Sequence, residues 1–311
     1  MLAAMGRGTI ALVGSGAVGS YYGGRLAAAG EEVRFLVRSG LEELRREGLT
    51  VESVNGDFHL AAPRVYATAE EIGPADLVVV AWKATSNRHF GEVLPPLVGE
   101  DTAILTLQNG LGNTERLAEL FGGERVMGGL CFVCINRLRP GMIRHTAAGH
   151  IRIGEYRGGI SVRLRELEVR MRRAGIEARA VDDLAHAQWV KLVWNVPFNG
   201  LTIVEGGIDT EALLAMPGGE DEVRALMAEV IEGAAVLGHE IPRPVIDQQV
   251  EVTRPMGPYR PSSMIDYVEG REVELEAIWE EPYRRAREAG AQLPAWKGLL
   301  ERLRERLADR G

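Results

Sequence analysis

The sequence predicts an α/β protein: an N-terminal doubly wound sheet followed by an all-helical C-terminal domain. Three observations support this fold class. Short apolar runs bounded by glycine alternate with helical segments over residues 9–181, and a glycine-rich turn joins the first run to a helix. After residue 182 the strand patterns largely vanish and long helical patterns take their place.

The first βαβ unit is the clearest local prediction. Residues 9–13 (TIALV) are typical of a buried strand, and the glycine-rich turn Gly14-Ser15-Gly16-Ala17-Val18-Gly19 follows at once. Residues 20–29 have helical composition and end at Gly30, and residues 32–37 (EVRFLV) are a second strand. Strand, glycine turn, helix and strand within thirty residues are the pattern of a Rossmann-type domain.

The remaining elements of the sheet domain follow in order. We expect a helix over 41–47, then a hairpin of strands 50–54 and 58–61 around Asn55-Gly56. Strands 75–81 and 103–107 alternate with helices 90–98 and 114–121, the first of which ends at Pro95-Pro96. Strands 126–134 and 142–153 join at Pro140-Gly141, and helix 162–174 and strand 176–181 complete the domain.

Four helical patterns make up the rest of the chain, over residues 184–202, 211–237, 264–289 and 295–308. We therefore divide the chain into an NADP-binding domain, residues 1–182, and a helical substrate and catalytic domain, residues 183–311. Asp182 or Asp183 is the expected N-cap of the first helix. Ligands bind at the carboxyl ends of parallel strands, so we expect the site in the cleft between the domains.

Composition excludes several classes of function. The 311 residues carry a net charge of −8, which argues against nucleic acid as a partner, because such surfaces are usually basic. No apolar run reaches the roughly 18 residues that a membrane span needs. Residues 1–9 have no apolar core of a secretion signal, so a cytoplasmic protein is expected. A homodimer through the C-terminal helices is also expected.

Cys131 and Cys134 form a lone C-x-x-C motif. A redox pair or half of a metal site is one interpretation, and two buried thiols on a strand is the other. Residues three apart on a strand point to opposite faces, and no further C-x-x-C or histidine pair completes a zinc site. We favour the second interpretation and expect no metal.

The residue after the second strand indicates which dinucleotide the glycine turn binds. NAD-binding domains usually carry an acid there, which accepts a hydrogen bond from the ribose. This chain has Arg38 at that place, while Glu31 and Glu32 precede the strand. A guanidinium suits a 2′-phosphate by charge and by geometry, so we expect NADPH/NADP+ as the cofactor; a solvent-facing arginine is the alternative.

Lys191 is one of only three lysines, with Lys83 and Lys297, in a chain that uses arginine for nearly every positive charge. Lys191, Asn195 and Asn199 are four residues apart on a helical segment, so they share one face among apolar and aromatic neighbours. A buried lysine has a lowered pKa and can act as a general acid. The alternative is a lysine that reaches solvent beside two capping amides. Pro197 is expected to kink or end this helix.

At these residues the chain resembles the ketopantoate reductases (2-dehydropantoate 2-reductases) over most of its length. The motifs that match are the glycine turn with Arg38, Lys83 after Val79-Val80-Ala81-Trp82, the segment Leu107 to Gly112, the segment Trp189 to Asn199, Ser262-Ser263-Met264, and Gly270 to Glu274. The resemblance implies reduction of 2-dehydropantoate to (R)-pantoate by NADPH, a step of pantothenate and coenzyme A biosynthesis.

The resemblance also implies a role for each matching residue. Lys191 matches the general acid and Glu274 the carboxylate that engages the substrate's hydroxyl end. Ser263 matches the hydroxyl that holds the substrate carboxylate. Asn109, Asn195 and Asn199 match amides that orient the substrate and the nicotinamide, and Lys83 matches a lysine at the cofactor edge of the cleft.

Two departures from the family pattern leave alternatives open. The stretch from Ser263 to Glu274 is one residue shorter than usual, so Glu272 or Glu276 competes for the role given to Glu274. A family amide beyond Asn199 falls on Asp209, an acid that is unfavourable near an anionic substrate unless it points away. The runner-up functions are a reductase of another 2-oxo acid or an imine, and an inactive NADP-sensing protein.

Overall fold

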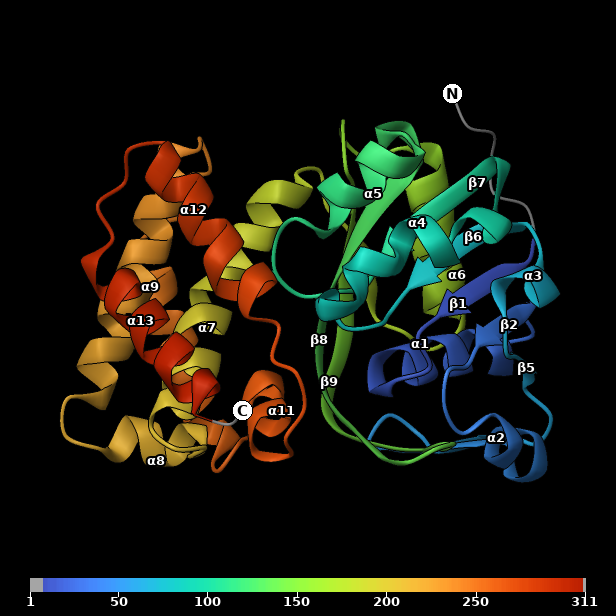
Figure 1. Cartoon of the computed structure of the whole chain (residues 1–311), viewed down its shortest axis with the longest axis horizontal. Coiled ribbons are helices and arrows are strands. Elements are labelled where there is room, and N and C mark those ends of the chain that lie inside the picture. The colour runs from blue at the N-terminus through green and yellow to red at the C-terminus, as the bar shows by residue number, and fades with distance from the viewer. Residues whose placement is uncertain (1–7, 310–311) are drawn as a thin grey trace. The chain divides into compact units, whose positions relative to one another are not determined.

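The computed structural model describes residues 8–309, in two compact units (Figure 1). One unit comprises the residues up to 109 and residues 113–184, and the other comprises residues 110–112 and those from 185 onward. Residues 1–7, which carry most of the expectation about a secretion signal, lie outside the described residues.

A ten-stranded sheet forms the centre of the first unit, in the order β4-β3-β9-β8-β7-β6-β1-β2-β5, with β10 paired to β9. The pairs β3–β4 and β8–β9 are antiparallel and the others are parallel. The strands are β1 (Ile10–Val13), β2 (Val33–Leu36), β3 (Leu49–Ser53), β4 (Phe58–Leu60), β5 (Arg64–Tyr66), β6 (Ala75–Val80), β7 (Val98–Thr106), β8 (Val126–Arg139), β9 (Met142–Glu155) and β10 (Ala178–Ala180).

Helices cover both faces of this sheet. They are α1 (Ala17–Ala28), α2 (Leu41–Glu47), α3 (Ala69–Ile72), α4 (Phe90–Val93), α5 (Asn113–Phe121) and α6 (Val162–Arg173), with the 3₁₀ helices η1 (Ala84–His89), η2 (Pro95–Leu97) and η3 (Gly123–Arg125). The predicted doubly wound α/β domain is confirmed. The expected helix over 90–98 is wrong in extent, because Pro95 and Pro96 already stand in a separate 3₁₀ turn.

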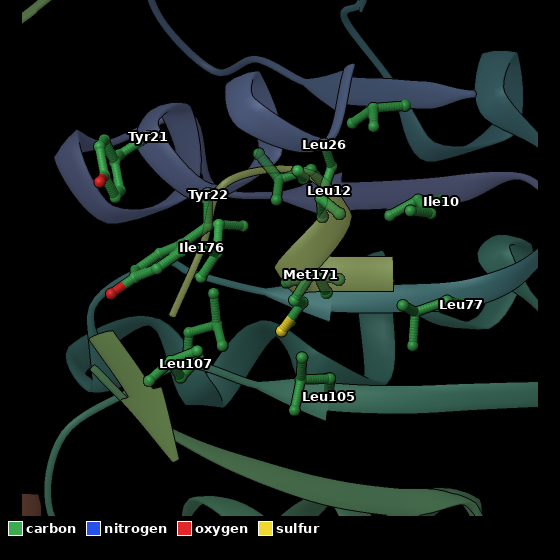
Figure 2. Packing of buried hydrophobic residues seen from close by; sticks show 14 of the residues in the cluster. Ile10, Leu12, Tyr21, Tyr22, Leu26, Leu77, Leu105, Leu107, Met171 and Ile176 are labelled. Atoms are coloured by element: carbon green, nitrogen blue, oxygen red, sulfur yellow. The ribbon is translucent and has the colours of Figure 1, made fainter. Parts of the chain in front are cut away.

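The central strands are mostly apolar where both of their faces are buried. Leu12, Leu77 and Leu105 face a cluster that includes residues of α1 and α6, and Figure 2 shows them with Leu26 of α1 and Met171 of α6. The alternate residues of the same strands, such as Val13 and Val80, face a second cluster with residues of α3, α4 and α5. The alternation follows from the two-residue period of a strand.

The second unit is helical, as predicted, and packs around a core of its own. Its helices are α7 (Leu184–Val204), α8 (Thr210–Ala215), α9 (Gly219–Val236), α10 (Val245–Thr253), α11 (Ser262–Val268), α12 (Glu281–Glu288) and α13 (Pro294–Ala308), with the 3₁₀ helix η4 (Arg254–Met256) and the π-helix η5 (Glu276–Glu280). No helix among the described residues is long and apolar enough to cross a membrane.

Two long helices expected in this unit are wrong. The pattern over 211–237 divides into α8 and α9, because Pro217 and Gly218 interrupt it and Gly218 adopts a positive φ of 76°. The pattern over 264–289 is interrupted between α11, which ends at Val268, and η5, which begins at Glu276, and Gly270 in this interval adopts a positive φ of 73°. The segment that carries Glu274 is therefore not helical, which changes how that side chain is placed.

Pro197 is expected to kink or end its helix, and of these two alternatives the ending is wrong. The helix continues to Val204, and its side chains from Asn195 to Val204 are buried. The indole Nε1 of Trp279 donates a 2.9 Å hydrogen bond to the carbonyl of Val196, beside the proline. Tertiary packing of this kind outweighs the unfavourable propensity of an interior proline.

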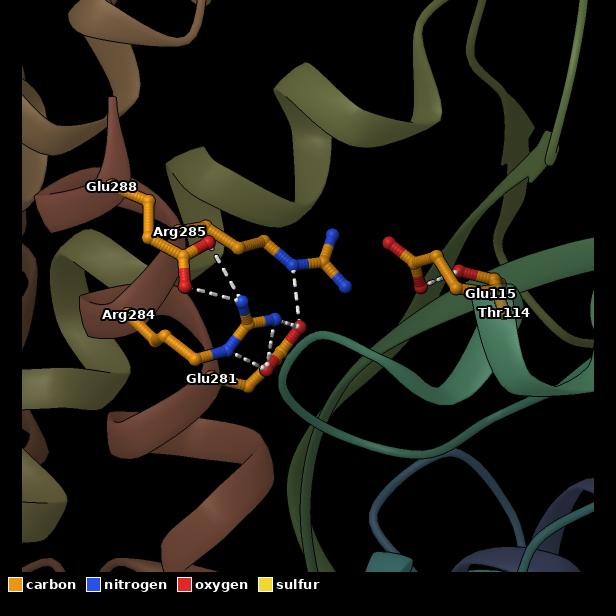
Figure 3. Close-up of polar contacts among 6 residues, drawn as sticks. All are labelled: Thr114, Glu115, Glu281, Arg284, Arg285 and Glu288. Carbon is orange, nitrogen blue, oxygen red and sulfur yellow. Dashed lines mark hydrogen bonds and ion pairs between the residues drawn. The ribbon is translucent and has the colours of Figure 1, made fainter.

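Ion pairs between residues three and four apart lie along the surface of α12. Arg284 pairs with Glu281 at 2.8 Å and with Glu288 at 2.7 Å, and Arg285 pairs with Glu281 at 2.7 Å (Figure 3). Since these residues are three and four apart, they are neighbours on the helix surface. In the other unit, the hydroxyl of Thr114 donates to Glu115 at 2.9 Å.

Candidate functional site

Four neighbouring parallel strands end in one row. Val13 of β1 is in register with Leu36 of β2 and with Val80 of β6, and Val80 is in register with Thr106 of β7. The predicted cofactor residues follow these strand ends within three positions: Gly14 after β1, Arg38 after β2, Lys83 after β6 and Asn109 after β7. Strand pairing thus brings together residues that lie up to 95 positions apart, at the edge where doubly wound sheets bind ligands.

The three glycines of the turn have different surroundings. Gly14 has a φ of 103°, and a Cβ there would lie 2.4 Å from the backbone nitrogen of Trp82. A Cβ on Gly19 would lie 2.1 Å from the carbonyl oxygen of Gly14, so α1 packs directly on the turn. A Cβ on Gly16 would meet no atom within 4 Å. Gly14 and Gly19 are therefore required by the fold, whereas Gly16 leaves open space beside the backbone.

The beginning of α1 is suited to an anion. Gly16 is the N-cap and provides no side-chain hydrogen bond to the first turn, which starts at Ala17 and Val18. The carbonyl of Ser15 turns back and accepts a hydrogen bond from the hydroxyl of Ser20 at 3.2 Å. The first amide groups of a helix have no intrahelical partner and stand at the positive end of its dipole. With the open face of Gly16, these features fit the pyrophosphate of a dinucleotide.

Arg38 is exposed two residues beyond the end of β2. The acids that precede β2 are held at its other end, where Glu31 pairs with Arg170 at 2.6 Å and Glu32 with Arg34 at 3.0 Å. Both acids are thus engaged away from the strand end at which a ribose would lie. Arg38 itself has no carboxylate partner among residues 8–309.

A series of hydrogen bonds, most of them between side-chain amides, fixes the loop after β7. The hydroxyl of Thr106 donates to Gln108 at 2.8 Å, and Gln108 donates to Asn87 at 2.7 Å. Asn87 donates to Asn113 at 2.7 Å, and Asn113 donates to the carbonyl of Asn109 at 2.9 Å. No motif in the sequence points to Asn87 or Asn113. Their hydrogen bonds fix the backbone at Asn109, while the exposed Lys83 stands at the N-cap of η1.

Lys191, Asn195 and Asn199 form one stripe on α7, as predicted, and their burial increases along it. Lys191 is half-buried, Asn195 is 8% exposed and Asn199 is 2% exposed. The lysine is therefore less buried than the two amides that follow it on this face. Nδ2 of Asn199 donates to the carbonyl of Asn195 at 3.2 Å, which anchors the deeper amide to its own helix.

Asn199 connects α7 to α11. Its Oδ1 accepts a 3.0 Å hydrogen bond from the backbone amide of Ser263, the second residue of α11. Ser263 is fully buried, and its Oγ has no hydrogen-bond partner among the described residues. Since leaving a buried hydroxyl unpaired costs about 1–3 kcal/mol, this group calls for a ligand or a water molecule.

Burial distinguishes the three competing glutamates. Glu274 is 3% exposed, whereas Glu272 and Glu276 are exposed. Asp266 and Arg271 close the preceding loop, since Nε of Arg271 donates to Asp266 at 2.9 Å. This closure turns the chain between α11 and η5, so Glu274 is the acid of the three that the unit buries.

Asp209 caps a helix of the second unit. It is the N-cap of α8, and its Oδ1 accepts a 2.8 Å hydrogen bond from the backbone amide of Ala212. An aspartate is a favoured N-cap residue because its carboxylate accepts from the first turn. The acid at this position is thus accounted for without a role in binding an anionic substrate.

The two cysteines lie on β8 and form no disulfide. Cys131 is buried as expected, but Cys134 is half-buried, because it lies on the part of the strand that extends beyond the core. Among residues 8–309, no group of three or more histidine, cysteine or acidic side chains is placed to hold a metal ion.

Comparison with known proteins gives consistent matches over most of the chain. A family model described as "Ketopantoate reductase PanE/ApbA" matches residues 10–158, and one described as "Ketopantoate reductase PanE/ApbA C terminal" matches residues 183–307. A 2-dehydropantoate 2-reductase from Nostoc sp. is 40% identical over 299 residues, which cover 94% of this chain and 93% of that protein.

Solved structures agree with these matches. The crystal structure of 2-dehydropantoate 2-reductase from Geobacter metallireducens superposes with a TM-score of 0.93 at 44% identity, and covers 96% of this chain and 99% of its own. D-mandelate dehydrogenase, solved with NADH and anilino(oxo)acetate, has a TM-score of 0.89 at 21% identity, with 97% of this chain and 99% of its own covered. The second similarity concerns the fold alone.

Proposed function

Because the chain belongs to the ketopantoate reductase family, we propose that it reduces 2-dehydropantoate to (R)-pantoate with NADPH, in pantothenate and coenzyme A biosynthesis. The observation that carries this proposal is the arrangement in the helical unit. Lys191, Asn195 and Asn199 share one face of α7, and Asn199 holds the backbone of Ser263, whose buried hydroxyl has no hydrogen-bond partner among residues 8–309. A small polar ligand is what such an arrangement can bind.

NADPH is the proposed cofactor. The glycine turn from Gly14 to Gly19 and the start of α1 would hold the pyrophosphate, and Arg38 would pair with the 2′-phosphate. Lys83 and Asn109, at the ends of the next two strand loops, would contact the nicotinamide half. The engagement of Glu31 and Glu32 with arginines supports NADPH over NADH, since neither of these two acids is then available to a ribose hydroxyl.

When bound, NADPH would supply the hydride for the ketone carbon of the substrate, and the carbonyl electron pair would remain on the substrate oxygen. Nζ of Lys191 would stabilise this developing alkoxide and then donate its proton, giving the 2-hydroxy acid. Oγ of Ser263 would hold the substrate carboxylate, and Glu274 would accept a hydrogen bond from the substrate's hydroxyl. Asn195 and Asn199 would orient both groups, because their own positions are fixed by burial.

A half-buried lysine is compatible with this role. Lysine can give up a proton near neutral pH when its surroundings lower its pKa, whereas arginine stays protonated. The chain uses arginine for almost all other positive charges, yet this position on α7 carries a lysine. A protein that only senses NADP needs no general acid, so this choice favours a reductase.

A substrate panel tests the proposal. The initial rate of NADPH oxidation at 340 nm would be measured with 2-dehydropantoate, with other small 2-oxo acids and with a cyclic imine. We expect the highest kcat/KM with 2-dehydropantoate. A higher kcat/KM with another substrate would overturn the assignment within the family, and tight NADPH binding without turnover of any substrate would favour a sensor. The same assay with NADH in place of NADPH tests the proposed cofactor. Equal values of kcat/KM with NADH and with NADPH would refute the preference for NADPH.

A further inference from the structure

We propose that Arg137 is a second ligand of the cofactor's 2′-phosphate and acts together with Arg38. This inference rests on the proposed use of NADPH. Arg137 lies on β8, far along the chain from both the glycine turn and Arg38, and no motif in the sequence singles it out. The fold nevertheless places its guanidinium between these two segments.

The position of the guanidinium is given by two contacts. Nη1 of Arg137 lies 3.4 Å from the carbonyl oxygen of Ser15, inside the glycine turn. Nη2 lies 3.5 Å from the hydroxyl of Ser39, the residue next to Arg38. In doubly wound dinucleotide-binding domains, the 2′-phosphate lies beside the residues that follow the second strand. Arg137 therefore reaches the place at which Arg38 is expected to bind the same group.

Several contacts fix the tip of the β8–β9 hairpin next to α2 and to the loop after β2. Arg139 pairs with Glu47 of α2 at 2.6 Å, and the amide of Thr50 donates to the carbonyl of Gly141 at 2.8 Å. Gly40 has a φ of 83°, and a Cβ there would lie 2.3 Å from Cβ of Pro140. Figure 1 shows the hairpin extending to α2. These contacts hold the strand beside the loop after β2.

The guanidinium of Arg137 retains donors for a ligand. Both of its contacts are long and go to neutral acceptors, and it has five N–H groups in all. Arg137 is exposed, and it has no carboxylate partner within residues 8–309. Arg139, two residues further on, is paired with Glu47. A cation left without a carboxylate beside Arg38 suits a phosphate dianion, whose charge of about −1.5 to −2 exceeds what one arginine neutralises.

The test compares ligands that differ only in the 2′-phosphate. Dissociation constants would be measured by calorimetry for adenosine 2′,5′-bisphosphate and for 5′-AMP, and by nucleotide fluorescence for NADPH and NADH. Arg137→Ala should raise the Kd of adenosine 2′,5′-bisphosphate and of NADPH at least 5-fold, and change that of 5′-AMP and NADH less than 2-fold. Arg137→Lys should recover part of the loss, since it restores the charge without the planar fork.

The salt dependence of NADPH binding distinguishes a direct charge contact of Arg137 from a purely structural role. Added NaCl should weaken NADPH binding more steeply for the wild type than for Arg137→Gln, because one charge pair has been removed. Arg144→Ala is the matched control, because Arg144 is an exposed arginine of the neighbouring strand β9 that pairs with Glu52 at 2.8 Å. It should leave all four dissociation constants within 2-fold of the wild type.

Two failures are distinguishable. If the wild type binds NADH as tightly as NADPH, the proposed cofactor preference is wrong. If the wild type and Arg38→Ala behave as proposed but Arg137→Ala binds NADPH like the wild type, the preference stands and the role of Arg137 is refuted. A parallel loss of affinity for all four ligands, or the same loss in Arg144→Ala, would show that the hairpin acts by shaping the loop, and it would also refute the proposal.

Discussion

Alanine substitution at two glycines of the turn should separate binding from folding. At Gly16 the added methyl group meets no protein atom within 4 Å, and a φ of −74° is ordinary for alanine. At Gly19 the methyl carbon would lie 2.1 Å from the carbonyl oxygen of Gly14. That is more than about 1 Å inside the usual contact distance of roughly 3.5 Å, so α1 or the turn must move.

The expected magnitudes follow from these surroundings. Gly19→Ala should lower the free energy of unfolding by about 1–3 kcal/mol, as overpacking of a rigid contact does. In Gly16→Ala a weaker N-cap and a less flexible unfolded chain offset one another, so the free energy of unfolding should stay within about 1 kcal/mol of the wild type. Its methyl group fills the space that the pyrophosphate would approach, so Kd for NADPH should rise at least about 10-fold, or 1.4 kcal/mol.

Thermal melting of the apoprotein and fluorescence titration with NADPH measure the two effects separately. Gly298→Ala is the control, because its methyl group in α13 also meets nothing within 4 Å. It should gain about 0.5–1 kcal/mol of stability from helix propensity and keep the wild-type Kd. If Gly16→Ala melted like the wild type and bound NADPH equally well, the open face of Gly16 would not be where the phosphates lie.

Three further predictions concern stability. Glu155→Gln should lower the free energy of unfolding by about 3–5 kcal/mol in urea denaturation, because it leaves the buried guanidinium of Arg163 without its carboxylate; an unchanged midpoint would contradict this. Glu229→Gln should lower the free energy of unfolding by about 1 kcal/mol, since Glu229 accepts hydrogen bonds from the amides of Ala295 and Trp296 at the start of α13. A free energy of unfolding equal to that of the wild type would contradict this prediction. Burial lowers the pKa of His145 below its usual 6.5, so the unfolded chain takes up a proton first as the pH falls. The free energy of unfolding should therefore decrease from about pH 7 towards pH 5, and less steeply in His145→Gln; parallel slopes would exclude this histidine as the cause.

The first domain could be predicted well because its signals are local. The strands that are buried on both faces have continuous apolar runs, and glycine or proline marks their ends. Two short elements, β5 and α3, were missed, although Thr68 and Glu71 form a capping box at the start of α3 that the sequence displays. The ends of β8 and β9 extend beyond the predicted bounds because the two strands support each other in a hairpin, where polar residues continue the pairing.

The helical unit was harder to predict for a physical reason. A 3.6-residue apolar period continues across Pro217 and Gly270, yet the chain breaks there, because each piece packs against different neighbours. The opposite happens at Pro197, where packing keeps the helix intact. The π-helix from Glu276 to Glu280 has no signature in the sequence.

The residues of the candidate site also fall into two groups, those that a local sequence pattern reveals and those that only the fold brings together. The glycine turn, Arg38 and the stripe on α7 have regular spacing, so the sequence displays them. Asn87 and Arg137 act across the fold on residues 26 and 122 positions away, which no local pattern reveals. Glu274 could be separated from its neighbours only by the burial that the interrupted helix produces.

The role of Lys191 as proton donor is the central claim, and one pair of variants tests it most directly. Steady-state NADPH oxidation with 2-dehydropantoate would be compared for the wild type, Lys191→Ala and Lys297→Ala, the last a lysine on the exposed face of α13 paired with Glu301 at 3.6 Å. Loss of a general acid should lower kcat/KM at least about 100-fold in Lys191→Ala without weakening NADPH binding, and Lys297→Ala should match the wild type. A wild-type kcat/KM in Lys191→Ala would contradict the account.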